Sequence, residues 1–131
     1  MNILDENVLE SQRELLLRWH LPFRQVGYEI GRKGAKDEQI VRLLLSLRQP
    51  TFFTLDGDFY KQNLRPAGYS LVNLDVEDSE VTGFVRRLLR HPGFDTHAKR
   101  MGVVIRASHV GLDAWRLHME QLVHYDWADQ V

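Results

Sequence analysis

The chain has 131 residues, of which 44% are hydrophobic and 27% are charged, as expected for a globular protein that buries one core. We therefore expect a single domain over residues 1–131. The formal net charge of −1 excludes a bulk polycation, so nucleic-acid binding would need a local basic surface. The absence of cysteine excludes disulfides and cysteine-based zinc sites, and it fits a reducing cytosol.

The N-terminal segment "MNILDENVLE" contains no basic region followed by a long apolar run, so we expect no signal peptide. No fully apolar run exceeds three residues, whereas a helix needs about 20 to span a bilayer. These features predict a cytoplasmic protein without a membrane segment.

In the first part of the chain, the pattern predicts strands that alternate with helices. A short strand over Asn2–Leu4 precedes a helix that starts at Glu6 and ends at Pro22. The segment "FRQVGYEI" is typical of a second short strand, and the basic loop "GRKGAK" follows it. Asp37 then occupies an N-cap position, ahead of a helix that Pro50 stops.

The second part continues this alternation. Strands are predicted over Thr51–Leu55, Tyr69–Leu74 and Gly102–Ala107. Between the last two, a helix capped by Asp78 or Ser79 runs to the segment His91-Pro92-Gly93. A final helix is expected from about Gly111, with one apolar side formed by Leu112, Trp115, Met119, Leu122 and Val123.

The resulting order, β-α-β-α-β-β-α-β-α, predicts an α/β protein with a mostly parallel sheet and helices on its faces. In such a sheet the carboxyl ends of the strands lie along one edge. Ligands bind in the crevice outside that edge.

Carboxylates follow the predicted strands at this edge. Asp5 comes directly after the first strand, and Asp56 and Asp58 come after the third, separated by one glycine. Asp37 and Glu38 open the helix that follows the second strand. We therefore expect three separate segments of the chain to bring carboxylates to one edge, with Asp56 and Asp58 on the same side of an extended backbone.

Clustered carboxylates repel one another, so such a group usually holds a cation. Oxygen ligands without cysteine favour Mg²⁺ or Mn²⁺ over zinc, and these ions suit phosphodiester hydrolysis. Most of these acids also have a structural interpretation: Asp5 and Asp37 as N-caps, Asp58 as a turn residue, and Glu6 and Glu38 as acids at helix starts. The six histidines show no ligand spacing, and we assign none of them to catalysis.

Three motifs, "NILDENV", "GAKDEQIV" and "TFFTLDGDF", resemble in order and spacing those of a short bacterial PIN-like family. The resemblance covers Asn2–Phe59, and the second half of the chain does not extend it. It implies a three-layer α/β/α sandwich and an Mg²⁺- or Mn²⁺-dependent ribonuclease, often the toxin of a toxin–antitoxin pair. It also implies an acidic site made of Asp5, Asp37, Asp56 and Asp58, with Glu38 as an additional or alternative member.

Further residues are expected to meet substrate or partners. Asn7 and Thr54 would orient a ligand, a phosphate or a carboxylate, and loop cations would hold phosphates, namely Arg32, Lys33, Lys36 and Lys61. We expect RNA as substrate, with a cognate antitoxin or a second copy of the chain as possible protein partners. The alternative is a non-catalytic PIN-like module that regulates through protein or nucleic-acid contacts.

Overall fold

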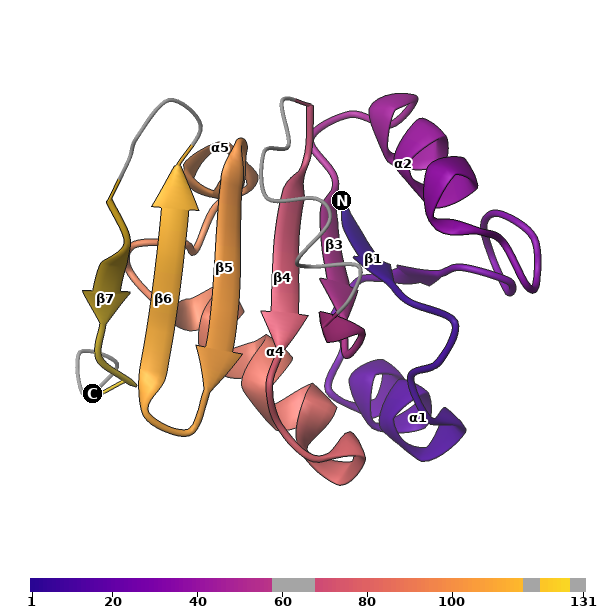
Figure 1. Cartoon of the computed structure of the whole chain (residues 1–131). Coiled ribbons are helices and arrows are strands. Elements are labelled where there is room, and N and C mark those ends of the chain that lie inside the picture. Colours follow the sequence, from indigo (N-terminus) through magenta and orange to yellow (C-terminus); the bar gives the residue numbers. More distant parts are fainter. Residues whose placement is uncertain (58–67, 117–120, 128–131) are drawn as a thin grey trace.

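The computed structural model describes residues 1–57, 68–116 and 121–127 and has the predicted α/β class. Its centre is a seven-stranded sheet with the order β2-β1-β3-β4-β5-β6-β7 (Figure 1). The pairings from β2 through β5 are parallel, and those of β5 with β6 and of β6 with β7 are antiparallel. The prediction of a mostly parallel sheet is therefore confirmed.

The strands are β1 (Asn2–Leu4), β2 (Arg24–Gln25), β3 (Thr51–Thr54), β4 (Ser70–Leu74), β5 (Val103–Ser108), β6 (Gly111–Arg116) and β7 (Val123–Tyr125). The helices are α1 (Glu10–Arg18), α2 (Asp37–Leu45), α4 (Val81–Arg90) and α5 (His97–Arg100), with a 3-10 turn η1 (Asp78–Glu80) before α4. No helix in these described ranges is long and apolar enough to cross a membrane.

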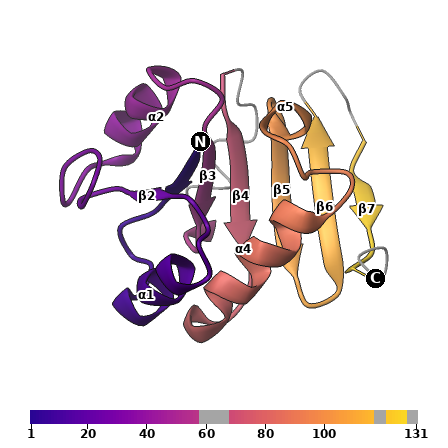
Figure 2. The same cartoon turned by 180° about the vertical axis from the view of Figure 1, so that it is seen from behind.

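Alternating side chains of the central strands form two separate apolar cores. Phe52 and Leu71 pack with α2, whereas Phe53 and Val72 lie one residue further along and pack with α1 and α4. The two views from opposite sides agree: α2 lies on one side of the sheet and α4 on the other (Figures 1 and 2). Strands buried on both faces explain why β3 and β4 are continuously buried rather than alternating.

Three predicted helix starts differ from the structure. The first helix begins at Glu10 instead of Glu6, because the carbonyl groups of the preceding segment are bound by the side chain of Gln25. The N-cap of α2 is Lys36 and not Asp37, which is already helical. The Gln39 side chain accepts a hydrogen bond from the Lys36 N–H group at 2.9 Å and closes this helix start.

The third difference is at the start of α4, where a cap at Asp78 or Ser79 was predicted. Both residues lie inside η1, whose N-cap is Glu77, and the N-cap of α4 is Glu80.

The predicted C-terminal helix is wrong, because the chain from Gly111 forms β6 and then β7. A two-residue turn after Ser108 returns β6 antiparallel to β5, with Ser108 opposite Gly111. Leu112 and Trp115, expected on one helix face, lie on opposite faces of the sheet. Met119 lies outside the described residues. The apolar side of a helix that was expected here is therefore absent from residues 111–116 and 123–125.

Gly111 offers a test of this hairpin. Its φ is +137°, and a Cβ atom there would lie 2.4 Å from the Tyr125 carbonyl oxygen on β7. We expect Gly111→Ala to lower the free energy of unfolding by at least about 2 kcal/mol in urea denaturation. The control is Gly83→Ala within α4, where a Cβ atom meets nothing within 4 Å. Because alanine favours a helix over glycine, this variant should have a free energy of unfolding higher by up to about 1 kcal/mol. Equal effects of the two substitutions would contradict the hairpin.

Candidate functional site

The carboxyl ends of β1 and β3 bring Asp5 and Asp56 together through one hydroxyl group. The Thr54 hydroxyl donates a hydrogen bond to Asp5 Oδ2 at 2.7 Å and accepts one from the Asp56 N–H group at 2.9 Å. Thr54 is fully buried, so it holds these two acids and does not face solvent. The backbone of Asp5 is fixed to β3 as well, because its N–H group donates to the Phe53 carbonyl.

The Asp5 carboxyl group lies in an environment that disfavours its ionised form. Its residue is only 9% exposed, and burial is the main cause that raises its pKa above the ordinary value of 3.8. The negative charges of Asp56 and Glu6 raise this pKa further, whereas the hydrogen bonds from Thr54 and from the Glu6 backbone lower it. A cation at this edge would offset both the burial and the repulsion.

The loop after β1 is shaped by Gln25, a buried residue of β2 that sequence reasoning missed. Its Nε2 group donates to the carbonyl oxygens of Asp5 and Val8, both at 3.1 Å, and its Oε1 atom accepts from Arg13 at 3.1 Å. Arg13 in turn forms an ion pair with Glu29. The signal available in the sequence was a glutamine between Arg24 and Val26 in the predicted strand, a polar side chain that must be hydrogen-bonded when it is buried.

Glu6 connects this acidic edge to the basic loop. Its Oε1 atom accepts a hydrogen bond from the Gly34 N–H group at 2.6 Å. A Cβ atom on Gly27, whose φ is +85°, would come within 3.0 Å of the Glu6 Oε2 atom. The Glu6 carboxylate thus fastens the loop between β2 and α2 beside Asp5.

The other predicted ligands lie in different surroundings. Asp37 is half-buried at the first position of α2, and Glu38 is exposed on the same helix. Within residues 1–57, 68–116 and 121–127, no three His, Asp or Glu side chains form a group that could hold a metal ion. Asp58 and Lys61 lie outside these ranges. Of the predicted acidic site, the described part of the chain thus links Asp5 with Asp56 through the Thr54 hydroxyl group.

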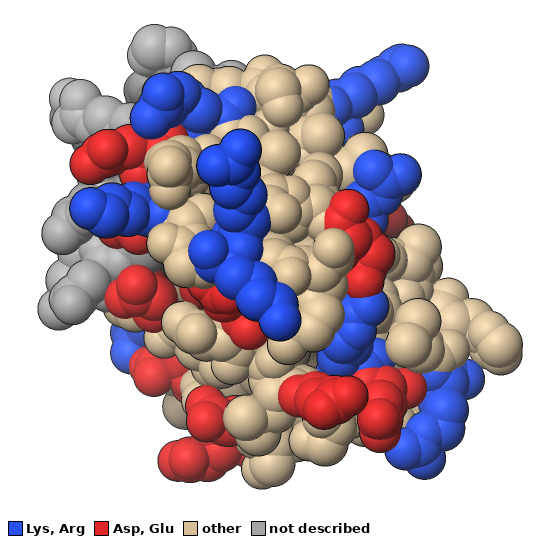
Figure 3. All heavy atoms as spheres, turned by 90° about the vertical axis from the view of Figure 1, so that its right-hand side faces the viewer, with Lys and Arg blue, Asp and Glu red and all other residues tan. Residues whose placement is uncertain are grey.

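The predicted phosphate-binding cations are exposed on the loop and do not form one basic surface. Arg32, Lys33 and Lys36 are all exposed, as is Asn7 on the loop after β1. Figure 3 shows Lys and Arg side chains spread over this side of the molecule, some of them adjoining near its centre, with Asp and Glu side chains among them. The basic loop therefore offers individual positive charges close to negative ones.

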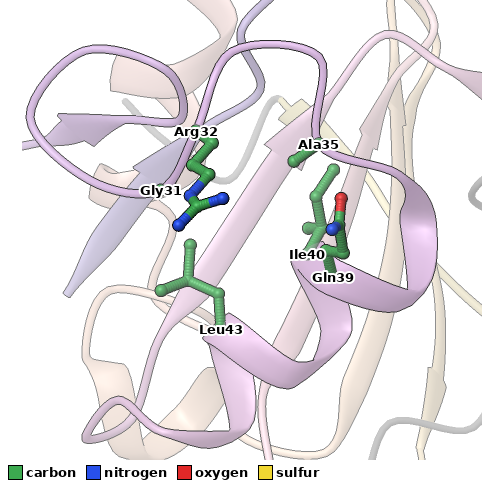
Figure 4. Close-up of a pocket in the computed structure, with 6 residues that line it drawn as sticks. All are labelled: Gly31, Arg32, Ala35, Gln39, Ile40 and Leu43. Atoms are coloured by element: carbon green, nitrogen blue, oxygen red, sulfur yellow. The ribbon is translucent and has the colours of Figure 1, made fainter.

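Arg32 also takes part in a hollow between this loop and α2. The hollow is lined by Gly31, Arg32, Ala35, Gln39, Ile40 and Leu43. In Figure 4 the Arg32 side chain points toward Leu43 across its opening, and Ile40 and Ala35 lie on the other side. The walls are mostly apolar, with one guanidinium group at the edge.

Sequence reasoning also missed a polar row that continues from the acidic edge across the sheet. The register pairs Thr54 with Asn73, Asn73 with Arg106, and Arg106 with Asp113. Asp75 follows β4 just as Asp5 follows β1, and Arg106 forms an ion pair with it at 2.5 Å. In the segment "SLVNLD", Asp75 directly follows a predicted strand, as Asp5 and Asp56 do. The sequence pattern therefore indicated Asp75 at the same edge of the sheet.

Comparisons with known proteins found no match: no family model, no curated protein and no solved structure matches the chain. The description of the site therefore depends on its geometry, and the PIN-like resemblance stays a prediction.

The raised pKa of Asp5 predicts a pH-dependent effect of Asp5→Asn. The native state holds this proton more tightly than the unfolded state does, so ionisation of Asp5 lowers stability as pH rises from about 3.8 through the raised pKa. Without divalent cations, Asp5→Asn should unfold at higher urea concentration than the wild type at about pH 7. This gain should disappear below about pH 3.8.

The exposed Glu38→Gln variant is the control for this experiment and should follow the wild-type curve. An Asp5→Asn variant less stable than the wild type at neutral pH would contradict the electrostatic description of Asp5.

The Thr54 hydroxyl should matter most when Asp5 is ionised. We expect Thr54→Val to lower the free energy of unfolding by about 1–3 kcal/mol at neutral pH, and by less in acid, because its bond to the carboxylate favours the charged form. The matched control is Ser70→Ala on β4, whose buried hydroxyl donates to the neutral Val103 carbonyl. The loss of unfolding free energy in Ser70→Ala should be the same at neutral and at acid pH. A pH-independent loss in Thr54→Val would argue against the Thr54–Asp5 bond.

Proposed function

We propose that this chain is a metal-dependent ribonuclease that hydrolyses RNA phosphodiester bonds at the edge where Asp5 and Asp56 meet. The observation that carries the proposal is the Thr54 bridge, which ties a buried carboxylate to the residue that follows the neighbouring parallel strand. Carboxyl ends of parallel strands are the usual place for ligands in open α/β sheets.

The residues present fit a hard divalent cation such as Mg²⁺ or Mn²⁺ better than zinc. Asp5 and Asp56 offer carboxylate oxygens, and the chain contains no cysteine. Because burial and neighbouring charges raise the pKa of Asp5, a cation there would favour its ionised form. Asp5 and Asp56 would hold Mg²⁺ or Mn²⁺, with Asp37, Glu38 and Asp58 as further predicted ligands. When bound, such an ion supplies an activated water and charge stabilisation for phosphodiester hydrolysis.

Other residues of the chain would position the acids and the basic loop. Thr54 keeps the Asp5 carboxylate oriented, and Gln25 holds the backbone on which Asp5 is carried. Glu6 keeps the basic loop next to the acidic edge through Gly34. Arg32, Lys33 and Lys36 on this loop would contact the phosphates of RNA.

Three finer assignments belong to the same proposal. The parallel strands with helices on both faces support a three-layer α/β/α sandwich of the PIN-like type. The three N-terminal motifs support a role as the toxin of a toxin–antitoxin module, with an antitoxin or a second copy of the chain as partner. A cytoplasmic location follows from this role.

The test is cleavage of single-stranded and structured RNAs by purified protein with Mg²⁺ or Mn²⁺. Asp5→Asn and Asp56→Asn should each lower the cleavage rate at least about a hundredfold, because removal of a carboxylate ligand removes the ion's charge stabilisation. Addition of Mn²⁺ should raise the melting temperature of the wild type and leave that of both variants unchanged.

A surface control is Asp95→Asn, at an exposed acid that precedes α5 and β5 and so lies toward the amino ends of the parallel strands. This variant should cleave like the wild type. Intact RNA under all conditions would overturn the ribonuclease proposal. Metal-independent RNA or protein binding that survives Asp56→Asn would support the alternative of a non-catalytic binding module instead.

A further inference from the structure

The sheet carries a second feature beside the acidic edge, a hollow of about 510 Å³ on the face of β4, β5 and β6 that points away from α4. It is lined by Gly57, Asn73, Asp75, Arg106, Asp113, Trp115 and Leu122. Gly57 directly follows Asp56, so the hollow begins next to the proposed catalytic edge. In Figure 1 this face of β5 and β6 is turned to the viewer, and no described helix crosses it.

The register of the sheet builds the floor of this hollow. Asn73, Arg106 and Asp113 stand opposite one another on β4, β5 and β6. Their neighbours in sequence, such as Ile105 and Ala114, belong to the core under α4 on the other face. Side chains in register on adjacent strands share a face, so these polar groups form one row.

Asn73 is the group that points to a ligand. It is only 6% exposed, and no hydrogen bond to its carboxamide is formed within the described part of the chain, although the residue lines the hollow. Among the described residues, Asn2 Oδ1 is the one fully buried side-chain oxygen or nitrogen atom without a partner, so the Asn73 carboxamide is not sealed in the core and reaches the space of the hollow. The hydrogen-bonding capacity of Asn73 is therefore directed to whatever enters the hollow.

The walls of the hollow bear two carboxylates and one guanidinium group, and the side chains of Arg106 and Asp75 are 45% and 53% exposed. Arg106 is held by Asp75 at 2.5 Å and lies 3.9 Å from Asp113. The other carboxylate oxygen of Asp113 has a partner as well, because His124 Nδ1 lies 2.8 Å from Asp113 Oδ1. Because two carboxylates surround the guanidinium group, the walls favour ligand groups that donate hydrogen bonds.

Trp115 supplies an apolar aromatic surface to the same hollow and is half-buried against the core under α2. Aromatic side chains contribute to nucleobase binding by stacking, and an asparagine carboxamide pairs with a base edge that offers one donor and one acceptor. The volume lies within the range of pockets that hold small organic ligands.

We propose that this hollow is a nucleobase subsite, in which Asn73 reads the edge of a base beside Trp115. Adenine and cytosine fit best, because each presents an amino group next to a ring-nitrogen acceptor. The amino group would donate to the Asn73 carbonyl in the negative surroundings of Asp75 and Asp113, whereas uracil would present a carbonyl oxygen to these carboxylates. The inference rests on the proposed ribonuclease function, for which Asn73 is a specificity-determining residue.

The test uses the four nucleosides, which lack phosphate and need no metal ion, with binding measured by saturation-transfer NMR and by titration. Adenosine and cytidine should bind about fivefold more tightly than uridine and guanosine, a difference worth about one hydrogen bond. Asn73→Leu should remove this preference, and Asn73→Asp, which keeps the shape but loses the donor, should weaken it. Thermal melting establishes that each variant is folded.

The readouts separate this inference from the proposed function. If the wild type cleaves RNA but Asn73→Leu cuts at the same bases, the ribonuclease stands and the subsite is overturned. If nucleosides bind with an Asn73-dependent preference while no RNA is cleaved, the subsite stands and the ribonuclease is overturned. Absence of nucleoside binding, or binding unaffected by both variants, also overturns the subsite.

Discussion

The buried hydroxyl of Thr54 is the contact on which the arrangement of the acidic edge depends. It lies between two strands that are distant in sequence, and it bonds the Asp5 carboxylate on one side and the Asp56 backbone on the other. Because Thr54 is fully buried, water cannot replace either bond without opening the sheet. The cost of keeping a carboxylate in such a place is visible in the raised pKa of Asp5.

Around this contact, the loops are held by side chains that do not themselves face a ligand. Gln25 binds carbonyl groups of the loop after β1, and Glu6 binds the backbone of Gly34. These bonds join residues that are 17 to 28 positions apart in the sequence. The geometry of the edge is therefore a property of the folded chain, as expected of sites supported by a second layer of hydrogen bonds.

The same parallel register extends the edge into the open face of the sheet. Thr54, Asn73 and Arg106 stand in one row because β3, β4 and β5 are in direct register. A shift of one residue in any strand would send that side chain into the core under α4. The acidic edge and the hollow above β4 to β6 are thus parts of one surface.

Prediction from the sequence succeeded where local chemistry and topology agreed. The strand before Asp56 is apolar, β-branched and aromatic, and the one before Asp5 is apolar, so both acids could be placed at the carboxyl edge of a parallel sheet. It failed for the C-terminal segment, because Leu112, Trp115 and Val123 satisfy a helical spacing as well as they satisfy strands. The hairpin that decides between them depends on pairing with β5 and β7, which no local window contains.

The amino-acid sequence by itself determined the α/β class, the position of Asp5 and Asp56 at strand ends, and the exposed cations of the basic loop, because these follow from periodicity and composition. Only the tertiary structure decided that Thr54 joins the two acids, that Glu6 holds the basic loop, and that Asn73 lies buried in a hollow beside Trp115. Each of these depends on which strands are neighbours and in what register, and that is set by long-range packing.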